Sequence, residues 1–413
     1  MSMTPSRTRR LLVAGAAAVA VGGLAWQLGR AGTEPLFPPY DFVEYWAAGR
    51  LALDGRDPYD AANLLELQRR LTGSDRTDAV MMWNPPWALP LVMPLGALPP
   101  RIGQLIWLVI SLACIVASAD LLWRGFGGPD RDRWVGWLVA LTFAPSLFVL
   151  TMGQISAILL LGFVGFVFAL RAGRPVAAGA AAALTALKPH LFALFALLVF
   201  LDAVRHRQTR QAAVVGAAVL VTCALIPLLW VPDVWQWYEA AALRPTDAAH
   251  VRTADWHQPA LGYVFRDLVP GRPVWAQFVP LGVALLVAPV YWWGRRHRWD
   301  WVAESPRLSL AFALTAAYGA WAFDLVILLP AVLWAAVRVR RTGRPVLTFA
   351  AAGLYLLLNL ACAFTITRPL SQDNPWIAPI VLGGYLLVAW TWPATGSRVS
   401  SETPTPPACR GAA

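Results

Sequence analysis

Polar side chains that suit ligand binding and proton transfer stand at a few separated places in an otherwise apolar sequence. Lys188 is the one lysine of the chain and interrupts the apolar run ALTALKPHLFALF, with His190 close by. Asp324 interrupts WAFDLVILLP, and a buried carboxylate needs a partner, for which Lys188 is a candidate. Ionisable residues inside apolar, membrane-spanning segments are more often functional than structural. The sequence therefore predicts either a ligand site or a structural Lys–Asp pair.

Three further stretches carry chemistry-bearing side chains. Asp41 lies near the start of YDFVEYWAAGRLALDGRDPYD, where a carboxylate also suits the N-terminus of a helix. Gln154 follows a glycine in LTMGQISAILL, and a glutamine at such a turn binds either a sugar hydroxyl or a backbone group. DWHQPALGYVFRDL supplies His257, Gln258 and Arg266 for a polar ligand. The alternative for these residues is a helix cap, a satisfied turn residue and a solvated loop, respectively.

The composition places these residues in a membrane protein. Hydrophobic residues make up 58% of the chain and charged residues 14%, with a mean hydropathy of +0.54, whereas soluble domains carry about 25% charged residues. The net charge is +11, but the arginines form short clusters between apolar segments, as the positive-inside rule predicts. This pattern argues against nucleic-acid binding. The cysteines form no CxxC pair, so neither a disulfide framework nor a metal site is indicated.

The arginine clusters order the crossings of the membrane. Between successive cytoplasmic clusters the chain crosses an even number of times, which predicts about twelve crossings with both ends inside. RTRRLLVAGAAAVAVGGLAWQLG is read as an uncleaved first helix. The expected membrane segments are 11–28, 102–123, 134–151, 154–170, 175–187, 190–204, 211–230, 273–293, 307–321, 325–338, 346–366 and 375–392.

The predicted fold is an all-α polytopic bundle in which residues 1–392 form one transmembrane domain and 393–413 a disordered cytoplasmic tail. The outer loops 29–83 and 231–272 form a roof over the bundle. Helical spacing from Asp41 to Ala52 predicts an amphipathic helix on the outer surface, with a second at 61–71. The proline-broken segment 85–100 is expected to be re-entrant or to lie on the surface.

Two predicted hairpins, 175–204 and 307–338, have arms shorter than a full span. Their tips should lie in a cavity open to water, because irregular backbone at membrane depth is tolerated only there. The trace then gathers Gln154, Lys188 and Asp324 on the outer side together with both outer loops. This convergence predicts an active site or a ligand cavity on that side.

Four separated stretches resemble the polytopic glycosyltransferases of the GT-C fold, in particular glycosyltransferase family 87, the DUF2029 proteins. The best-known members of that family are polyprenol-phosphate-mannose-dependent α-mannosyltransferases. The resemblance spans most of the chain in the expected order. The stretches are the pattern from Asp41 to Asp60, the segment from Pro85 to Pro99, GQIS with AAGAAAALTALKPH, and HQPALGYVFR with YGAWAFDLVILLP.

The resemblance implies a mechanism and a set of site residues. Asp41 acts as general base on the acceptor hydroxyl, the sugar leaves a lipid phosphate, and the anomeric centre inverts. Lys188, Arg266 and His257 bind the donor phosphate. No cofactor is implied, and Asp41 with Glu44 lacks a third ligand in the sequence for a metal ion. The residues expected to bind substrate are Glu44, Tyr45, Tyr59, Gln154, His190, Gln258 and Asp324.

Two departures from the family pattern leave the sugar and the acceptor open. His257-Gln258-Pro259 stands where relatives often read Asn-Gln-Ser, and Ser156 stands where they often have asparagine. The sequence has no P-loop, no GxGxxG and no soluble DxD site, so the donor is expected to arrive in the membrane. Glucose, galactose and arabinofuranose remain alternatives to mannose.

The main hypothesis is a polyprenyl-phosphate-dependent hexosyltransferase in a bacterial cytoplasmic membrane, among membrane lipids. Its active site faces the cell exterior or periplasm, and its acceptor is a lipid or a glycan. The alternative is a transporter or flippase of a lipid-linked or anionic substrate, with Lys188 and Asp324 as the intramembrane charge pair. No internal repeat of the kind common in transporters is evident, and two long outer loops favour an enzyme.

Overall fold

The described part of the chain is helical throughout. The computed structural model describes residues 40–244, 249–250, 261–317 and 321–366, together with 383 and 386, and these residues contain no β-strand. The all-α prediction is therefore confirmed for them. The expected first helix (11–28), the last segment (375–392), apart from 383 and 386, and the tail (393–413) lie outside the described residues.

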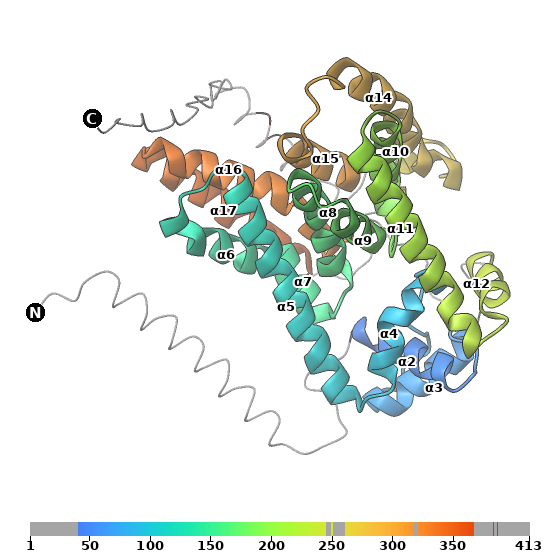
Figure 1. Ribbon diagram of the computed structural model, residues 1–413. Helices are drawn as coiled ribbons and strands as arrows, with labels where there is room; N and C mark the ends of the chain where they lie inside the picture. Colours follow the sequence, from blue (N-terminus) through green and yellow to red (C-terminus); the bar gives the residue numbers. More distant parts are fainter. Residues whose placement is uncertain are drawn as a thin grey trace, which may run out of the picture.

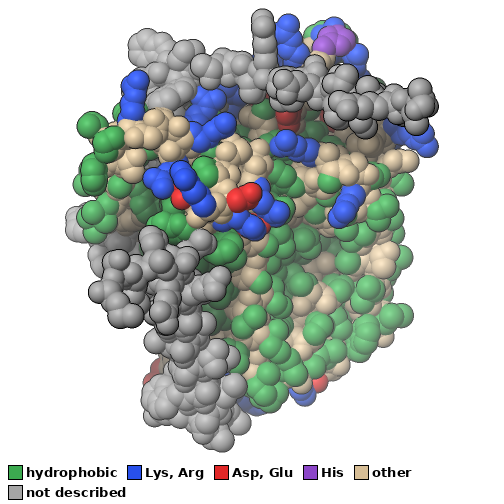
Figure 2. Space-filling model, turned by 60° about the vertical axis from the view of Figure 1, so that its left-hand side comes forward, with side chains coloured by type: hydrophobic (Ala, Val, Ile, Leu, Met, Phe, Trp, Pro, Cys, Tyr) green, Lys and Arg blue, Asp and Glu red, His purple; other side chains and the backbone are tan. Residues whose placement is uncertain are grey.

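Three helical stretches are long and apolar enough to cross a membrane, judged by length and composition. They are α5 (Pro100–Gly125), α11 (Arg207–Leu225) with η3 (Ile226–Leu229), and η4 (Val274–Phe278) with α14 (Val279–Arg295). A fourth is formed if α6 (Arg133–Thr142) and α7 (Ala144–Met152) are counted together as one broken span. The two helices meet at a bend of 59°. The described residues therefore give three or four span candidates, and the twelve predicted crossings are not confirmed. Figure 2 shows the broad hydrophobic surface that such helices present.

Helices α8, α9, α10, α16 and α17 follow the segments expected from the sequence, whereas α12 and α13 lie in the predicted outer loop 231–272 and α15 begins before the predicted segment 307–321. Proline is the first residue of α5, α9, α10 and α17, where its missing N–H costs nothing. The other elements are α2 (Phe42–Leu53), α3 (Ala61–Thr72), η1 (Pro86–Ala88), α4 (Leu89–Gly96), η2 (Asp130–Asp132), α8 (Ser156–Arg171), α9 (Pro175–Thr185), α10 (Pro189–Arg205), α12 (Val234–Ala242), α13 (Leu261–Leu268), α15 (Trp301–Thr315), η5 (Asp324–Leu328), α16 (Leu329–Thr342) and α17 (Pro345–Ile366).

Helix α8 lies at the centre of the bundle, between α5, α9, α10 and α15. Its Phe163 and Phe166 pack against Phe195 of α10 and against Phe312 and Trp301 of α15. The contacting ring centroids are 5.0–5.5 Å apart in edge-on geometry. Such pairs contribute about 0.5–1.5 kcal/mol each beyond the area that they bury. This aromatic cluster fixes the relative positions of three helices whose ends carry polar residues.

The prediction that the helix after Asp41 is amphipathic, with one face exposed, is wrong. Nine of the twelve residues of α2 are buried, and α4 packs directly on it. A Cβ at Gly49 or at Gly96 would collide with the backbone of the facing helix, so only glycine permits this close approach. Helix α2 is therefore packed on most of its sides, and Gly49 allows the close approach of α4. Helix α3 does have the predicted amphipathic character, with Leu64 and Leu65 buried and Arg69 exposed.

The molecule has two chemically different ends. Helices α2, α3, α4 and α12 lie together at one end, in the lower right of Figure 1, and we call this the α2 end. Helix α5 runs from there to the opposite end, beside α6 and α16. Basic side chains gather over that opposite end in Figure 2. We call it the arginine-rich end; Arg124, Arg171, Arg205, Arg295 and Arg340 lie in the last turns of the helices that finish there.

Candidate active site

The break between α9 and α10 holds Lys188. Helix α9 ends at Thr185, Lys188 has a non-helical backbone (φ −130°, ψ 78°), and Pro189 begins α10. Two side chains from the segment before α4 satisfy carbonyl groups left free at the end of α9. Asn84 Nδ2 donates to the Leu187 carbonyl oxygen (2.7 Å) and Trp87 Nε1 to that of Ala186 (2.8 Å). The predicted break at Lys188-Pro189 is thus confirmed and is braced by the first part of the chain.

Lys188 and Asp324 form the predicted ion pair. Lys188 Nζ lies 2.9 Å from Asp324 Oδ1, and the exposed fractions of the two side chains are 12% and 0%. Asp324, at the start of η5, also accepts from Ser156 Oγ (2.5 Å) and from the backbone N–H of Trp321 (3.2 Å). The ammonium lies 4.8 Å from the ring centroid of Phe323. Ser156 therefore has a definite role in holding Asp324.

Gln154 connects this ion pair to the first part of the chain. Its Oε1 accepts from Lys188 Nζ (3.1 Å) and from the Tyr45 hydroxyl (2.9 Å), while its Nε2 donates to Asp41 Oδ2 (2.8 Å). The preceding Gly153 ends α7 with a left-handed backbone (φ 73°), which aims the glutamine inward. The side chain is buried, and both ends of its amide are used. Gln154 is therefore more than a satisfied turn residue.

Asp41 precedes α2, and its carboxylate makes no capping hydrogen bond to that helix. The backbone of Asp41 is held instead, because its N–H donates to the Met152 carbonyl oxygen (3.0 Å). Its carboxylate faces Gln154. The alternative of a simple capping aspartate therefore does not hold, and Asp41, Gln154, Lys188 and Asp324 form one hydrogen-bonded chain.

Two carboxylates at this site have different environments. Burial raises the pKa of Asp41, while the hydrogen bond from Gln154 and the charge of Lys188 lower it. Burial, followed by the negative charge of Asp41, raises the pKa of Glu44 well above its usual range. Glu44 is buried, whereas Asp41 keeps part of its surface exposed. Asp41 is therefore the carboxylate that ionises more readily and that a ligand can reach.

Arg76 is a member of the site that the sequence did not single out. Its positive charge lowers the pKa of Asp41; burial lowers the pKa of Arg76 itself, and the negative charge of Asp41 opposes that shift. Arg76 Nη1 donates to Gln68 Oε1 (3.3 Å) on α3. Five other arginines precede it in the predicted outer loop 29–83, so nothing in the pattern distinguished this one.

Other predicted site residues lie around this chain or apart from it. His190, in the first turn of α10, experiences the charges of Lys188 and Asp324. Tyr59 is fully buried and its hydroxyl donates to the Asn84 carbonyl oxygen (3.1 Å). Asn84 in turn donates to the Leu187 carbonyl oxygen at the α9–α10 break. Tyr59 is therefore connected to the site through Asn84 and has no direct contact with Lys188 among the described hydrogen bonds.

Arg266 has its observed contacts within its own part of the chain. Its Nε donates to the Arg272 carbonyl oxygen (2.9 Å) and its Nη1 to Gln277 Oε1 (3.2 Å). None of these described contacts joins Arg266 to Asp41 or Lys188. His257 and Gln258 lie outside the described residues. Among the residues that are described, no group of three His, Cys, Asp or Glu side chains is placed to hold a metal ion.

Comparison with known proteins identifies the family. The model of glycosyltransferase family 87 matches residues 83–306, more than half of the chain. The match includes Gln154 and Lys188, while Asp41 precedes it and Asp324 follows it. No curated protein and no solved structure matches the chain. The chain therefore belongs to glycosyltransferase family 87, and the protein is a glycosyltransferase.

Proposed function

We propose that the protein transfers a hexose, with mannose favoured, from a polyprenyl-phosphate donor to a hydroxyl group of a lipid or glycan acceptor. The observation that carries the proposal is the hydrogen-bonded chain from Asp41 through Gln154 to Lys188 and Asp324. The side-chain amide of Gln154 joins the partly exposed carboxylate of Asp41 at its nitrogen to the partly exposed ammonium of Lys188 at its oxygen. A base for the acceptor and a cation for the donor phosphate are the two groups that this reaction requires.

The proposed reaction is a single displacement. The acceptor oxygen attacks the anomeric carbon as Asp41 takes the proton of the hydroxyl group. The bond between the anomeric carbon and the phosphate oxygen breaks, and the electron pair leaves with the polyprenyl phosphate. Lys188 and Arg76 stabilise the negative charge that grows on the phosphate. Attack opposite the leaving group inverts the anomeric centre.

The proposed orientation places the arginine-rich end in the cytoplasm and the α2 end outside a bacterial cytoplasmic membrane. The short arms around the site support this arrangement: α9 has 11 residues, whereas a full span needs about 20. The tip at Lys188 would then lie below the outer surface, in a region open to water. A donor with a polyprenyl tail reaches that depth through the membrane. About twelve crossings in the complete chain remain part of this proposal.

Transfer in detergent solution tests the function. The purified full chain, given polyprenyl-phosphate mannose with a membrane lipid extract, is expected to yield a mannosylated product detected by mass spectrometry. A nucleotide sugar supplied with the same extract is expected to yield none. Detergent solution has no compartments, so a new glycosidic product separates transfer from transport. Product from the nucleotide sugar alone would contradict the proposed donor.

Gln154→Leu is expected to move the acid limb of the pH–activity profile to higher pH. A general base must be ionised, so activity falls as the pH drops through the pKa of Asp41, which burial already holds above the ordinary 3.8. Gln154 lowers that pKa through its hydrogen bond, and removing the bond raises it further. The measurement is kcat/KM against pH with the detergent assay.

Tyr45→Phe is the matched control for this change. It removes the hydroxyl that donates to Gln154 Oε1 but leaves the bond from Gln154 Nε2 to Asp41. Its acid limb is expected to stay close to that of the wild-type protein. If Gln154→Leu lowers activity equally at every pH, then Gln154 supports the structure without tuning Asp41.

A further inference from the structure

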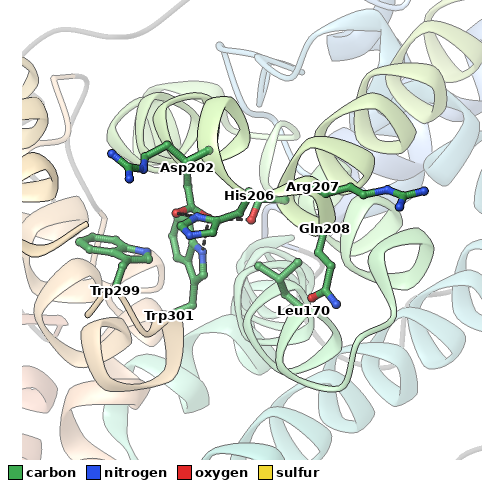
Figure 3. A pocket seen from close by; sticks show the side chains of 9 residues that line it. Leu170, Asp202, His206, Arg207, Gln208, Trp299 and Trp301 are labelled. Carbon is green, nitrogen blue, oxygen red and sulfur yellow. Dashed lines mark hydrogen bonds and ion pairs between the residues drawn. The ribbon is translucent and has the colours of Figure 1, made fainter. Parts of the chain in front are cut away.

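A cavity of about 340 Å³ lies at the arginine-rich end, far from the Asp41 site. Helix α10 starts beside Lys188 and ends at Arg205 in the cavity wall, 17 residues later, or about 25 Å along the helix. Figure 3 shows the side chains that surround the opening. The lining residues are Leu170, Asp202, Arg205, His206, Arg207, Gln208, Thr209, Trp299 and Trp301.

Asp202 organises one wall of this cavity. The carboxylate is buried and accepts hydrogen bonds from His206 Nδ1 (2.8 Å), Thr209 Oγ1 (2.6 Å), Trp301 Nε1 (3.1 Å) and Trp292 Nε1 (3.4 Å). Donors from the α10–α11 junction, α11, α14 and α15 thus meet on one group. Because both oxygens are fully used, Asp202 holds its neighbours in place and leaves the remaining lining to face a ligand.

The rest of the lining presents donors that lack acceptors. Arg205 and Arg207 are exposed, and no hydrogen bond or ion pair involves either side chain in the part of the protein that is described. The Trp299 indole N–H is buried without a described partner. The N-terminus of α11 also lies here, with no side-chain cap, and its dipole favours an anion. Two guanidinium groups against the one carboxylate in the lining, Asp202, leave the cavity positive.

The depth of the cavity favours a lipid as the source of that anion. Arg207 is the first residue of the α11 stretch that is apolar enough to span a membrane, so the cavity lies where lipid headgroups begin. Indole side chains such as those of Trp299 and Trp301 are typical of this level. Basic pockets between membrane helices on the arginine-rich side bind anionic headgroups. We propose that the cavity binds the phosphate of an anionic membrane lipid; a free phosphate ion shares the chemistry but lacks the glycerol that would fill this volume.

Native mass spectrometry of the purified full chain tests the assignment, with dihexanoyl-phosphatidylglycerol as the probe. One saturable lipid is expected. Arg205→Gln with Arg207→Gln should weaken its binding about thirtyfold, because each arginine near a lipid phosphate contributes a factor of about five. The matched control is Arg174→Gln with Arg210→Gln, which removes the same charge from the same end outside the cavity lining. The control pair should retain wild-type binding.

Further arms separate the possible outcomes. Equal weakening by both double variants would overturn the proposal, because the effect would then come from surface charge alone. Full displacement of the lipid by inorganic phosphate at equal concentration would overturn the lipid source and assign the cavity to a soluble phosphate. The cavity proposal does not depend on the proposed reaction: transfer activity should be unchanged in Arg205→Gln/Arg207→Gln, whatever its donor.

Discussion

Asp41→Asn is expected to lower kcat for sugar transfer by about 10²–10⁴-fold, the contribution of a positioned general base. The substitution changes almost no volume, and the asparagine Oδ1 can still accept the hydrogen bond that Gln154 Nε2 now donates to Asp41 Oδ2. The hydrogen-bonded chain should therefore persist, and only the ability to take a proton is lost. The measurement is single-turnover transfer with saturating polyprenyl-phosphate sugar, together with the thermal unfolding midpoint of each protein.

Glu44→Gln is the control for this result, three residues along the same part of the chain. Glu44 is buried, and burial followed by the negative charge of Asp41 raises its pKa well above the usual range, which favours the neutral form that glutamine imitates. We expect this variant to retain most of its activity and to fold normally. The reverse pattern, with activity lost in Glu44→Gln and kept in Asp41→Asn, would move the role of base to Glu44.

Lys188→Met is expected to destabilise the protein by about 3–5 kcal/mol, the cost of leaving a buried charge without its partner. Asp324 is 0% exposed and would keep only its bonds from Ser156 and the Trp321 backbone. The thermal unfolding midpoint and the yield of monodisperse protein measure this loss. On its own, however, the variant does not separate a structural lysine from one that binds the donor.

The double variant Lys188→Met/Asp324→Asn makes that separation. It removes both charges together, and the asparagine can still accept from Ser156 and the Trp321 N–H, so most of the stability should return. If Lys188 binds the donor phosphate, transfer should remain about 10²–10³-fold below wild type, the usual cost of removing one transition-state donor. Recovery of activity with stability would show that the pair has only a structural role.

The sequence predicted the helices of the bundle well because their ends carry strong signals. Proline begins α5, α9 and α10, and arginine lies in the last turns of α5 and α10 and immediately before α9. The burial of α2 was missed for a physical reason. Four of its twelve residues are alanine or glycine, and small residues look the same in a pattern whether they face water or a closely packed helix such as α4.

The site residues could be predicted where a polar residue interrupts an apolar run. Those in polar stretches could not be recognised from the sequence. Lys188, Asp324 and Gln154 stood out because polar groups in apolar runs need partners, and they are indeed one another's partners. Arg76 could not be distinguished from its neighbours in the sequence, because its loop region is rich in arginine. Its electrostatic interaction with Asp41 depends on how the loop folds back over α3, which cannot be predicted from the spacing of residues along the chain.

The Lys188–Asp324 pair has a consequence for the order in which the protein is made. Its two residues are 136 positions apart, and a ribosome adding ~5–20 residues per second needs on the order of ten seconds to travel that distance. During this interval the newly made α9–α10 hairpin carries an ammonium group whose ion-pair partner, Asp324, has not yet been made. The ion pair can form only after α15 and the start of η5 have been made. The last third of the chain thus determines when the ion pair at the tip of the α9–α10 hairpin can form.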